Sequence, residues 1–175
     1  RFAQAGVTRA ICLLTDSLVF NAVQRCNGFR RTFTALCTQP ECSYERILIP
    51  PIASPNSSAL VAALLLNATY EGIVITGPSV VQRAIPLLEQ PAYRIPNRRI
   101  ALFDSIDERM YRLLDDQIIF FAVDVGPWLQ GFMPVLFASY YVQTGQRLIT
   151  SNNSATFLKT GPVFVAARPI SSKTR

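Results

Sequence analysis

The chain has 175 residues, half of them apolar and only 16% charged, so it can bury a substantial core and is not typical of a disordered protein. Its net charge of +6 arises from 17 basic and 11 acidic residues that are scattered along the sequence. A nucleic-acid-binding surface usually clusters its basic residues, and here the only tight basic pairs are Arg30–Arg31 and Arg98–Arg99. We therefore expect no nucleic-acid partner.

Short β-branched runs alternate with segments of helical periodicity, which predicts an α/β fold. The expected architecture is a doubly wound, mostly parallel sheet of five to six strands with helices on both faces. Strands are expected at residues 10–14, 46–49, 72–75, 99–103, 118–123 and 162–166. Helices are expected at residues 23–36, 59–66, from residue 79 onward, 106–114 and 128–142.

Local signals give these helices further detail. A serine before residue 59 is expected to cap the second helix, and Pro86 is expected to kink or end the third. The longest apolar stretch, at residues 126–142, is shorter than the roughly 20 residues that a membrane span needs. We therefore predict that it forms a buried helix.

The four cysteines are Cys12, Cys26, Cys37 and Cys42. The chain has no histidine and no Cys-x-x-Cys pair, which are the usual ligands of a zinc site. Disulfides are therefore favoured over a zinc site. Cys37 and Cys42 bracket a short turn, a spacing that readily closes a disulfide. A strand residue can also meet the helix that packs on it, so a Cys12–Cys26 pair is a hypothesis.

Three sequons, at Asn56, Asn67 and Asn152, are candidate N-glycosylation sites. A single sequon arises often by chance, but three of them together with paired cysteines favour a secreted eukaryotic chain. The chain starts at Arg1 without a leader, which indicates a mature product or a piece of a longer chain. The expected location is extracellular or at the cell surface, with the periplasm as the alternative.

Polar residues follow several of the predicted strands. In open α/β sheets, ligands bind beyond the carboxyl ends of the strands, so these residues are candidate ligand contacts. They are Asp16, Thr76, Asp104 and Asp124. The structural alternative is that such residues simply favour turns for local reasons.

Several segments, in the correct order, resemble the sugar-binding periplasmic proteins. Ala-Gln-Ala-Gly-Val-Thr-Arg-Ala-Ile-Cys at residues 3–12 resembles the opening of their second lobe. Arg-Cys-Asn-Gly-Phe at residues 25–29 resembles their Arg-x-x-Gly-Phe, and Ile-Ala-Leu-Phe-Asp at residues 100–104 resembles their strand ending in Phe-Asp. Residues 121–131 resemble their Ala-Val-Asp-Gln-Gln-Pro-Tyr-Leu-Gln-Gly segment, and residues 160–163 resemble the final crossing between lobes.

The resemblance implies one lobe of a Venus-flytrap receptor that closes on a small polar ligand such as a sugar, with no cofactor and no catalysis. It implies that residues 1–123 form the second lobe and that residues 124–146 form a hinge and a helix that packs on the first lobe. Residues 147–168 would then be the return crossing and final strand, and residues 169–175 a tail. The first lobe would precede Arg1, or a partner chain would supply it.

The resemblance also implies roles for single residues. Arg25 and Asp104 fall where the family binds ligand hydroxyls, and both groups suit vicinal hydroxyls because each can form two parallel hydrogen bonds. Trp128 can stack on the apolar face of a sugar. The structural alternatives are that Arg25 covers the helix surface, Asp104 caps a turn and Trp128 lies in a core.

The sequence departs from the family at two places. Gly77–Pro78 replaces an Asn-Asp pair, and Val125–Gly126 replaces a Gln-Gln pair, so hydrogen-bonding side chains are lost from the expected pocket. The alternative function is therefore a structural or protein-interaction module that no longer binds a small ligand, within a membrane-anchored receptor or a larger assembly.

Two other classes fit the sequence less well. An enzyme could use the aspartates at the strand ends as acid and base, but the chain offers no histidine, phosphate-binding glycine loop or metal-ligand spacing. A transcription regulator of the related repressor type needs an N-terminal DNA-binding helix pair, and paired cysteines argue against a cytosolic location.

Overall fold

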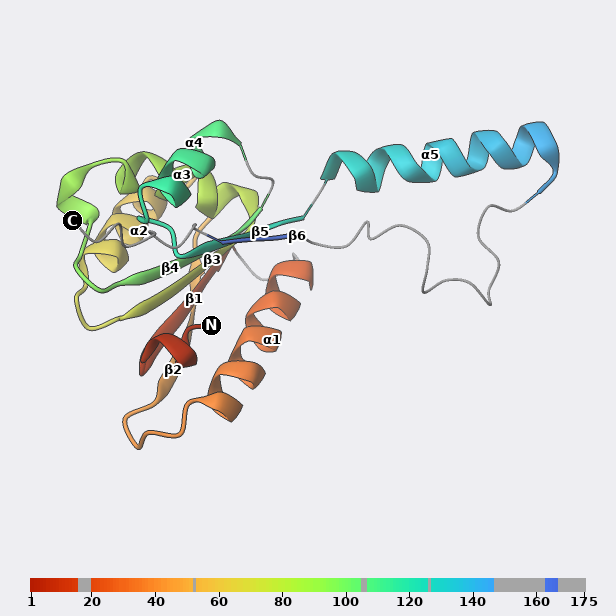
Figure 1. The fold of residues 1–175 in the computed structure, drawn as a ribbon. Helices are drawn as coiled ribbons and strands as arrows, with labels where there is room; N and C mark the ends of the chain where they lie inside the picture. The colour runs from red at the N-terminus through yellow and green to blue at the C-terminus, as the bar shows by residue number, and fades with distance from the viewer. Residues whose placement is uncertain (16–19, 52, 105–106, 126, 147–162, 167–175) are drawn as a thin grey trace, which may run out of the picture.

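The structure is a computed structural model that describes residues 1–15, 20–51, 53–104, 107–125, 127–146 and 163–166. Its centre is a six-stranded sheet in the order β2-β1-β3-β4-β5-β6 (Figure 1). Strands β1 to β5 are parallel, and β6 runs antiparallel to β5. The strands are β1 (Arg9–Thr15), β2 (Ser43–Ile49), β3 (Gly72–Thr76), β4 (Arg99–Asp104), β5 (Phe121–Asp124) and β6 (Val163–Ala166). The predicted mostly parallel α/β sheet is confirmed.

Helices cover both faces of this sheet, as predicted. Figure 1 shows α1 on one face and α2, α3 and α4 on the other. The helices are α1 (Phe20–Leu36), α2 (Asn56–Leu66), α3 (Pro78–Leu88) and α4 (Glu108–Asp115), with short 3-10 turns at Ala3–Ala5 and Pro91–Tyr93. The order and the distribution of helices are those of an open doubly wound fold.

The core is divided into two layers by the sheet. Along β1, Ile11 and Leu13 belong to the layer under α2, α3 and α4, whereas Cys12 and Leu14 belong to the layer under α1. All four side chains are fully buried. A strand covered on both faces has no polar side to present, which explains why β1 and β3 read as continuous apolar runs.

Two disulfides reinforce the α1 side. Cys12 of β1 is bonded to Cys26 of α1 with a Cα–Cα distance of 5.8 Å, and Cys37 is bonded to Cys42 with a Cα–Cα distance of 6.0 Å. Both predicted pairs are therefore confirmed. The first pair is fully buried and fixes the helix against the central strand.

At the amino ends of the strands, Arg98 holds the turn between α2 and β3. Its guanidinium donates hydrogen bonds to three backbone carbonyls, those of Leu65, Asn67 and Tyr70, the last at 3.1 Å. The residue is only 8% exposed, and burial lowers the pKa of the guanidinium. Arg98 is therefore a buried structural residue of the turn.

Glu71 lies at the same edge and joins the first turn of the chain to the sheet. Its carboxylate accepts hydrogen bonds from the backbone N–H of Thr8 at 2.7 Å, the hydroxyl of Thr8 at 2.9 Å and the backbone N–H of Arg9 at 3.3 Å. These donors stabilise the charged form and lower the pKa of the Glu71 carboxyl.

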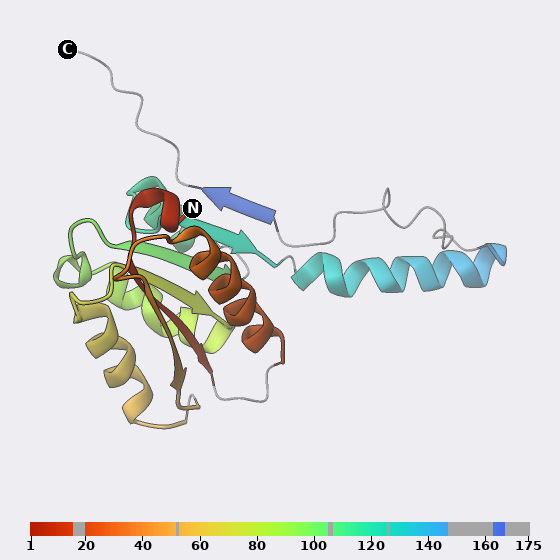
Figure 2. The same cartoon turned by 90° about the horizontal axis from the view of Figure 1, so that it is seen from below.

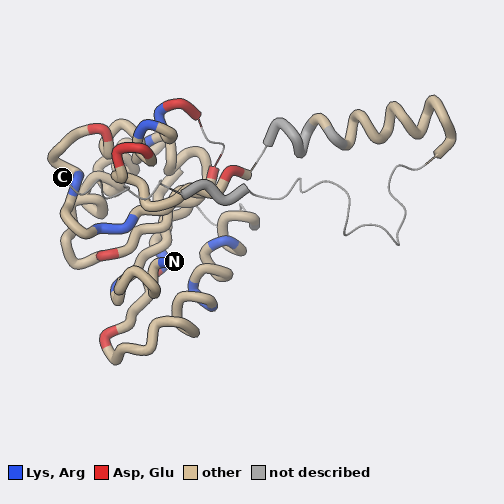
Figure 3. Tube along the Cα trace, in the orientation of Figure 1, with Lys and Arg blue, Asp and Glu red and all other residues tan. Residues whose placement is uncertain are grey.

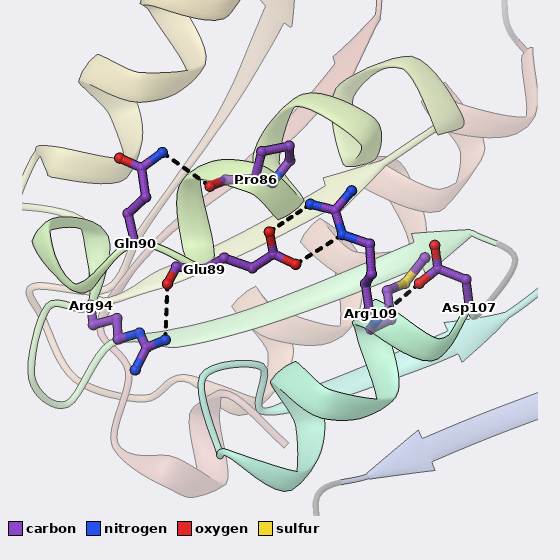
Figure 4. A network of polar contacts seen from close by, with 7 residues as sticks. Pro86, Glu89, Gln90, Arg94, Asp107 and Arg109 are labelled. Atoms are coloured by element: carbon purple, nitrogen blue, oxygen red, sulfur yellow. Dashed lines mark hydrogen bonds and ion pairs between the residues drawn. The ribbon is translucent and has the colours of Figure 1, made fainter.

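Polar contacts join α3 to α4 (Figure 4). Arg109 donates two hydrogen bonds to the carboxylate of Glu89, at 2.8 and 2.6 Å. The Asp107 carboxylate accepts a hydrogen bond from the backbone N–H of Met110 at 2.9 Å and so caps α4. The pair of Glu89 and Arg109 is solvent-exposed, so it orients the two helices more than it stabilises them.

Helix α5 (Pro127–Thr144) differs from the prediction. It was expected to be buried, but it extends away from the sheet (Figure 2) and leaves several large apolar side chains in solvent. Those exposed by 43% to 83% are Phe132, Val135, Leu136, Tyr141 and Val142. The sequence of α5 contains no charged residue, and the described part of the helix is drawn without charge in Figure 3. In the described part of the chain, no helix has both the length and the apolarity to cross a membrane.

Smaller differences concern helix ends. No serine caps α2, because the helix begins before the predicted cap; Pro55 is its N-cap and Ser57 donates from within the helix to the Ser54 carbonyl at 2.8 Å. Pro86 lies inside α3 and does not end it. Leu36 is 54% exposed because it is the last residue of α1.

Candidate ligand-binding rim

The carboxyl ends of the parallel strands meet along one edge of the sheet. We call this edge the carboxyl-end rim and define it by Thr15, Thr76, Asp104 and Asp124, the last residues of β1, β3, β4 and β5. In the register of the sheet Leu14 is opposite Thr76, and Asp104 is opposite Asp124. Parallel pairing therefore brings residues far apart in sequence into one row.

The strand order reverses within this row, between β1 and β3. Connections leave the two strands in opposite directions there, which is where open α/β sheets leave room for a ligand. α1 follows β1 on one face and α3 follows β3 on the other. The rim thus has the topology of a binding edge.

The turn from β3 into α3 explains the departure at Gly77–Pro78. Gly77 has φ of 94°, a backbone conformation that favours glycine, and a Cβ there would lie 3.7 Å from the Thr15 hydroxyl oxygen. Pro78 is the first residue of α3, where its missing N–H costs nothing. The pair gives a tight turn but presents no polar side chain to the rim.

Thr76 is an unusual member of the rim. The residue is completely buried, and within the described structure its hydroxyl oxygen has no hydrogen-bond partner. An unsatisfied buried hydroxyl costs about 1–3 kcal/mol. Strand alternation gives Thr76 the orientation of Val74, which packs on the α1 side.

The two aspartates lie beside each other but face the other way. Asp104 and Asp124 are partly buried neighbours in register. Strand alternation gives them the orientation of Leu102 and Ala122, which pack toward α2, α3 and α4. The predicted residues therefore share one edge, while Thr76 and the aspartate pair border opposite faces of it.

Arg25 lies in α1, on the other face of the sheet from α2, α3 and α4. It precedes the disulfide-bonded Cys26, on the border of the stripe that α1 presents to the sheet, and is partly buried. Among the described residues its guanidinium has no hydrogen-bond or ion-pair partner. Asp16 lies outside the described residues, as does the side chain of Trp128, whose backbone forms the first turn of α5.

A hollow of about 710 Å³ lies on α1, outside the carboxyl-end rim. Its described lining is Gln24, Asn27, Gly28, Arg30, Arg31 and Thr34, all on the outer surface of α1. It is open to solvent and opposite the sheet-facing residues of the helix, so it is not part of the rim. Within the described residues, no group of three or more carboxylates or thiols gathers where it could hold a metal ion.

The fold of the chain is similar to the folds of several solved structures. No protein-family model and no curated protein matches the sequence. A carbohydrate transporter from Acidothermus cellulolyticus, solved with myo-inositol, superposes with a TM-score of 0.72 at 23% identity, over 95% of this chain and 54% of that one. A carbohydrate-transporter solute-binding protein from Agrobacterium radiobacter, solved with D-arabinose, gives 0.66 at 14% identity, over 98% and 55%.

A glucose-galactose binding protein from Geobacillus stearothermophilus gives a TM-score of 0.61 at 16% identity, over 96% of this chain and 56% of that one. The chain therefore has the fold of the sugar-binding periplasmic proteins and spans about half the length of the structures it matches. The resemblance seen in the sequence is confirmed at the level of the fold.

Proposed function

We propose that the chain is a ligand-binding lobe of a sensing or solute-binding protein that takes a small polar ligand such as a sugar at the carboxyl-end rim, without catalysis. The observation that carries this proposal is the row of polar groups at the strand ends, with Asp104 and Asp124 side by side in the register of the sheet. The sugar ligands in two structures of the same fold support the choice of ligand class.

The chemistry of these groups suits hydroxylated ligands. A carboxylate accepts hydrogen bonds from two neighbouring hydroxyls, and a guanidinium donates two in parallel. Asp104 would accept such hydrogen bonds and Arg25 would donate them, while the hydroxyl of Thr76 is buried and has no hydrogen-bond partner among the described residues. Trp128 and Asp16 remain candidate contacts.

Helix α5 supports a two-lobed arrangement. Its uncharged surface, with Val135 68% and Val142 83% exposed, is the kind that another protein surface covers. We propose that residues 1–123 form one lobe and that residues 124–146 lead to a second lobe, on which α5 packs. Residues 147–168 would return to the first lobe, where β6 pairs with β5, and residues 169–175 would form a tail.

The proposed setting is extracellular or at the cell surface, within the secretory pathway of a eukaryote. The two disulfides support an oxidising compartment, and the bacterial origin of the similar structures keeps the periplasm as the alternative. The chain would then belong to a larger receptor or assembly, anchored in a membrane by parts outside the described residues.

A second candidate is a protein-interaction module that binds no small ligand. Gly77–Pro78 favours it, because this turn gives the rim no polar side chain where the family has two. The exposed apolar surface of α5 favours it as well. In this case α5 would be retained for assembly, and the polar rim would be a remnant.

Thermal unfolding with added myo-inositol or D-arabinose separates these candidates. At ten times Kd, a ligand stabilises the folded state by about 1.4 kcal/mol, which raises Tm by roughly 3–6 °C. We expect the rise in the wild type and in Asp116→Asn, an exposed control at the end of α4, and its loss in Asp104→Asn. A Tm that no sugar raises at any soluble concentration would favour the interaction module.

A further inference from the structure

We propose that Asn67 carries an N-linked glycan that stands on the edge of the lobe opposite the carboxyl-end rim. This inference rests on the proposed secretory setting but not on ligand binding. The three residues of the sequon, Asn67, Ala68 and Thr69, are all exposed. They form the turn between α2 and β3, so no helix or strand has to open to present them.

The conformation of the turn tolerates the modification. The side-chain oxygen Oδ1 of Asn67 accepts a hydrogen bond from the backbone N–H of Thr69 at 3.0 Å. A glycan is attached to the other side-chain atom, the nitrogen Nδ2. The hydrogen bond that shapes the turn therefore survives glycosylation, because it uses only the carbonyl oxygen.

The backbone of the turn is held from below by Arg98. Its guanidinium donates to the carbonyls of Leu65, Asn67 and Tyr70, and the backbone N–H of Asn67 donates to the Ala63 carbonyl at 3.0 Å. With the main chain fixed on the inside, the Asn67 side chain is directed to solvent. A bulky group there meets no packed surface of the lobe.

The position also keeps the glycan away from the proposed function. Asn67 lies before the amino end of β3, and the rim lies at its carboxyl end, five strand residues or roughly 16 Å away. Asn56, by contrast, is the first residue of α2 and follows the carboxyl end of β2, on the side of the rim. A glycan at Asn67 leaves the rim and α5 free for a ligand and a second lobe.

The bond exchange needs a glycosyl donor of a definite class, a lipid-linked oligosaccharide diphosphate. Nδ2 of Asn67 forms a bond to the anomeric carbon of the first sugar and gives up one of its two protons to a base of the transferase. The bond from the anomeric carbon to the diphosphate oxygen breaks, and the lipid diphosphate leaves with the electron pair.

The test is secretion of the chain from eukaryotic cells behind a signal peptide, followed by peptide N-glycosidase treatment and peptide mass spectrometry. The matched variants are Thr69→Ala, which destroys the sequon, and Thr69→Ser, which keeps it; both retain the backbone N–H that bonds to Asn67. Asn56→Gln is the control for the sequon at the start of α2, whose asparagine is also exposed. Protein retained in the cells is analysed too, so poor secretion cannot hide the result.

We expect residue 67 to be recovered as aspartate after the glycosidase in the wild type, in Thr69→Ser and in Asn56→Gln. In Thr69→Ala we expect the mass of one glycan to be lost. An unmodified Asn67 in the wild-type protein, or a glycan mass unchanged in Thr69→Ala, would overturn the proposal. Neither result bears on sugar binding, which is measured separately by the rise in Tm.

Discussion

Replacing Arg98 by methionine should be among the most destabilising single changes in the lobe. Methionine keeps most of the aliphatic stem of Arg98 and removes every hydrogen-bond donor. The carbonyls of Leu65, Asn67 and Tyr70 then lose the guanidinium that binds them, and the Leu65 bond is the most buried of the three.

The magnitude follows from these three bonds. A hydrogen bond to a charged group contributes about 1.5–3 kcal/mol, and the bonds share one ordered side chain at a partly solvated edge, so we expect a total loss of about 3–5 kcal/mol. For a domain whose stability is on the order of 5–15 kcal/mol this is a large fraction. Tm should fall by roughly 10 °C or more.

The assay is urea unfolding followed by circular dichroism, with Arg99→Met as the matched control. Arg99 is the adjacent arginine; its guanidinium lies 5.1 Å from the centre of the Phe120 ring, a contact that contributes about 0.5–1 kcal/mol. The slope of unfolding free energy against urea should stay unchanged, so that the midpoint reports stability alone. A loss in Arg98→Met no larger than in Arg99→Met would refute the role given to Arg98.

Three further predictions concern the stability of the lobe. Since the folded pKa of Glu71 lies below the usual value of about 4.3, its stabilising effect is complete above that value and is lost as pH falls through the folded pKa. In pH-dependent urea unfolding, the advantage of the wild type over Glu71→Gln should therefore shrink below about pH 4, and an advantage constant with pH would contradict this. Replacing Cys12 and Cys26 by alanine opens a disulfide with a sequence separation of 14 and should lower the free energy of unfolding by about 3 kcal/mol. The same change at Cys37 and Cys42, with a separation of 5, should lower it by about 2 kcal/mol. Urea midpoints in the reverse order would count against the chain-entropy argument. Gly72→Ala should destabilise the lobe by about 1–3 kcal/mol, because the new Cβ would lie 2.8 Å from side-chain atoms of Phe2 and Val7. Gly28→Ala, within α1 and in open space, should stabilise it by about 0.5–1 kcal/mol. Equal shifts in Tm by calorimetry would refute the packing argument.

The sheet could be predicted from the sequence because its strands are buried on both faces. Runs such as residues 10–14 and 72–75 are apolar throughout, a pattern typical of parallel strands between two helical layers. The Cys37–Cys42 disulfide was predicted from the short turn between the two cysteines, and Cys12–Cys26 was a hypothesis because a strand residue can meet the helix that covers it. These features depend on local pattern alone.

Other features depend on tertiary context, and there the sequence was a poorer guide. The apolar pattern of α5 shows that the helix can be covered but not what covers it, and the described part of this chain leaves several of its apolar side chains exposed. The role of Arg98 could not be predicted, because nothing in the sequence shows that three backbone carbonyls converge on its guanidinium. The rim residues could be predicted from the strand ends. The side of the sheet on which each side chain lies could not, because it depends on the residue at which the strand ends.

The central claim is that the carboxyl-end rim binds a small polar ligand, and an NMR titration with myo-inositol and D-arabinose tests it most directly. Amide resonances should move in a saturable manner at Thr76, Gly77, Asp104 and Asp124, while those at the amino edge, such as Glu71, stay in place. Shifts centred on the amino edge, or no saturable shift with either sugar, would contradict the account.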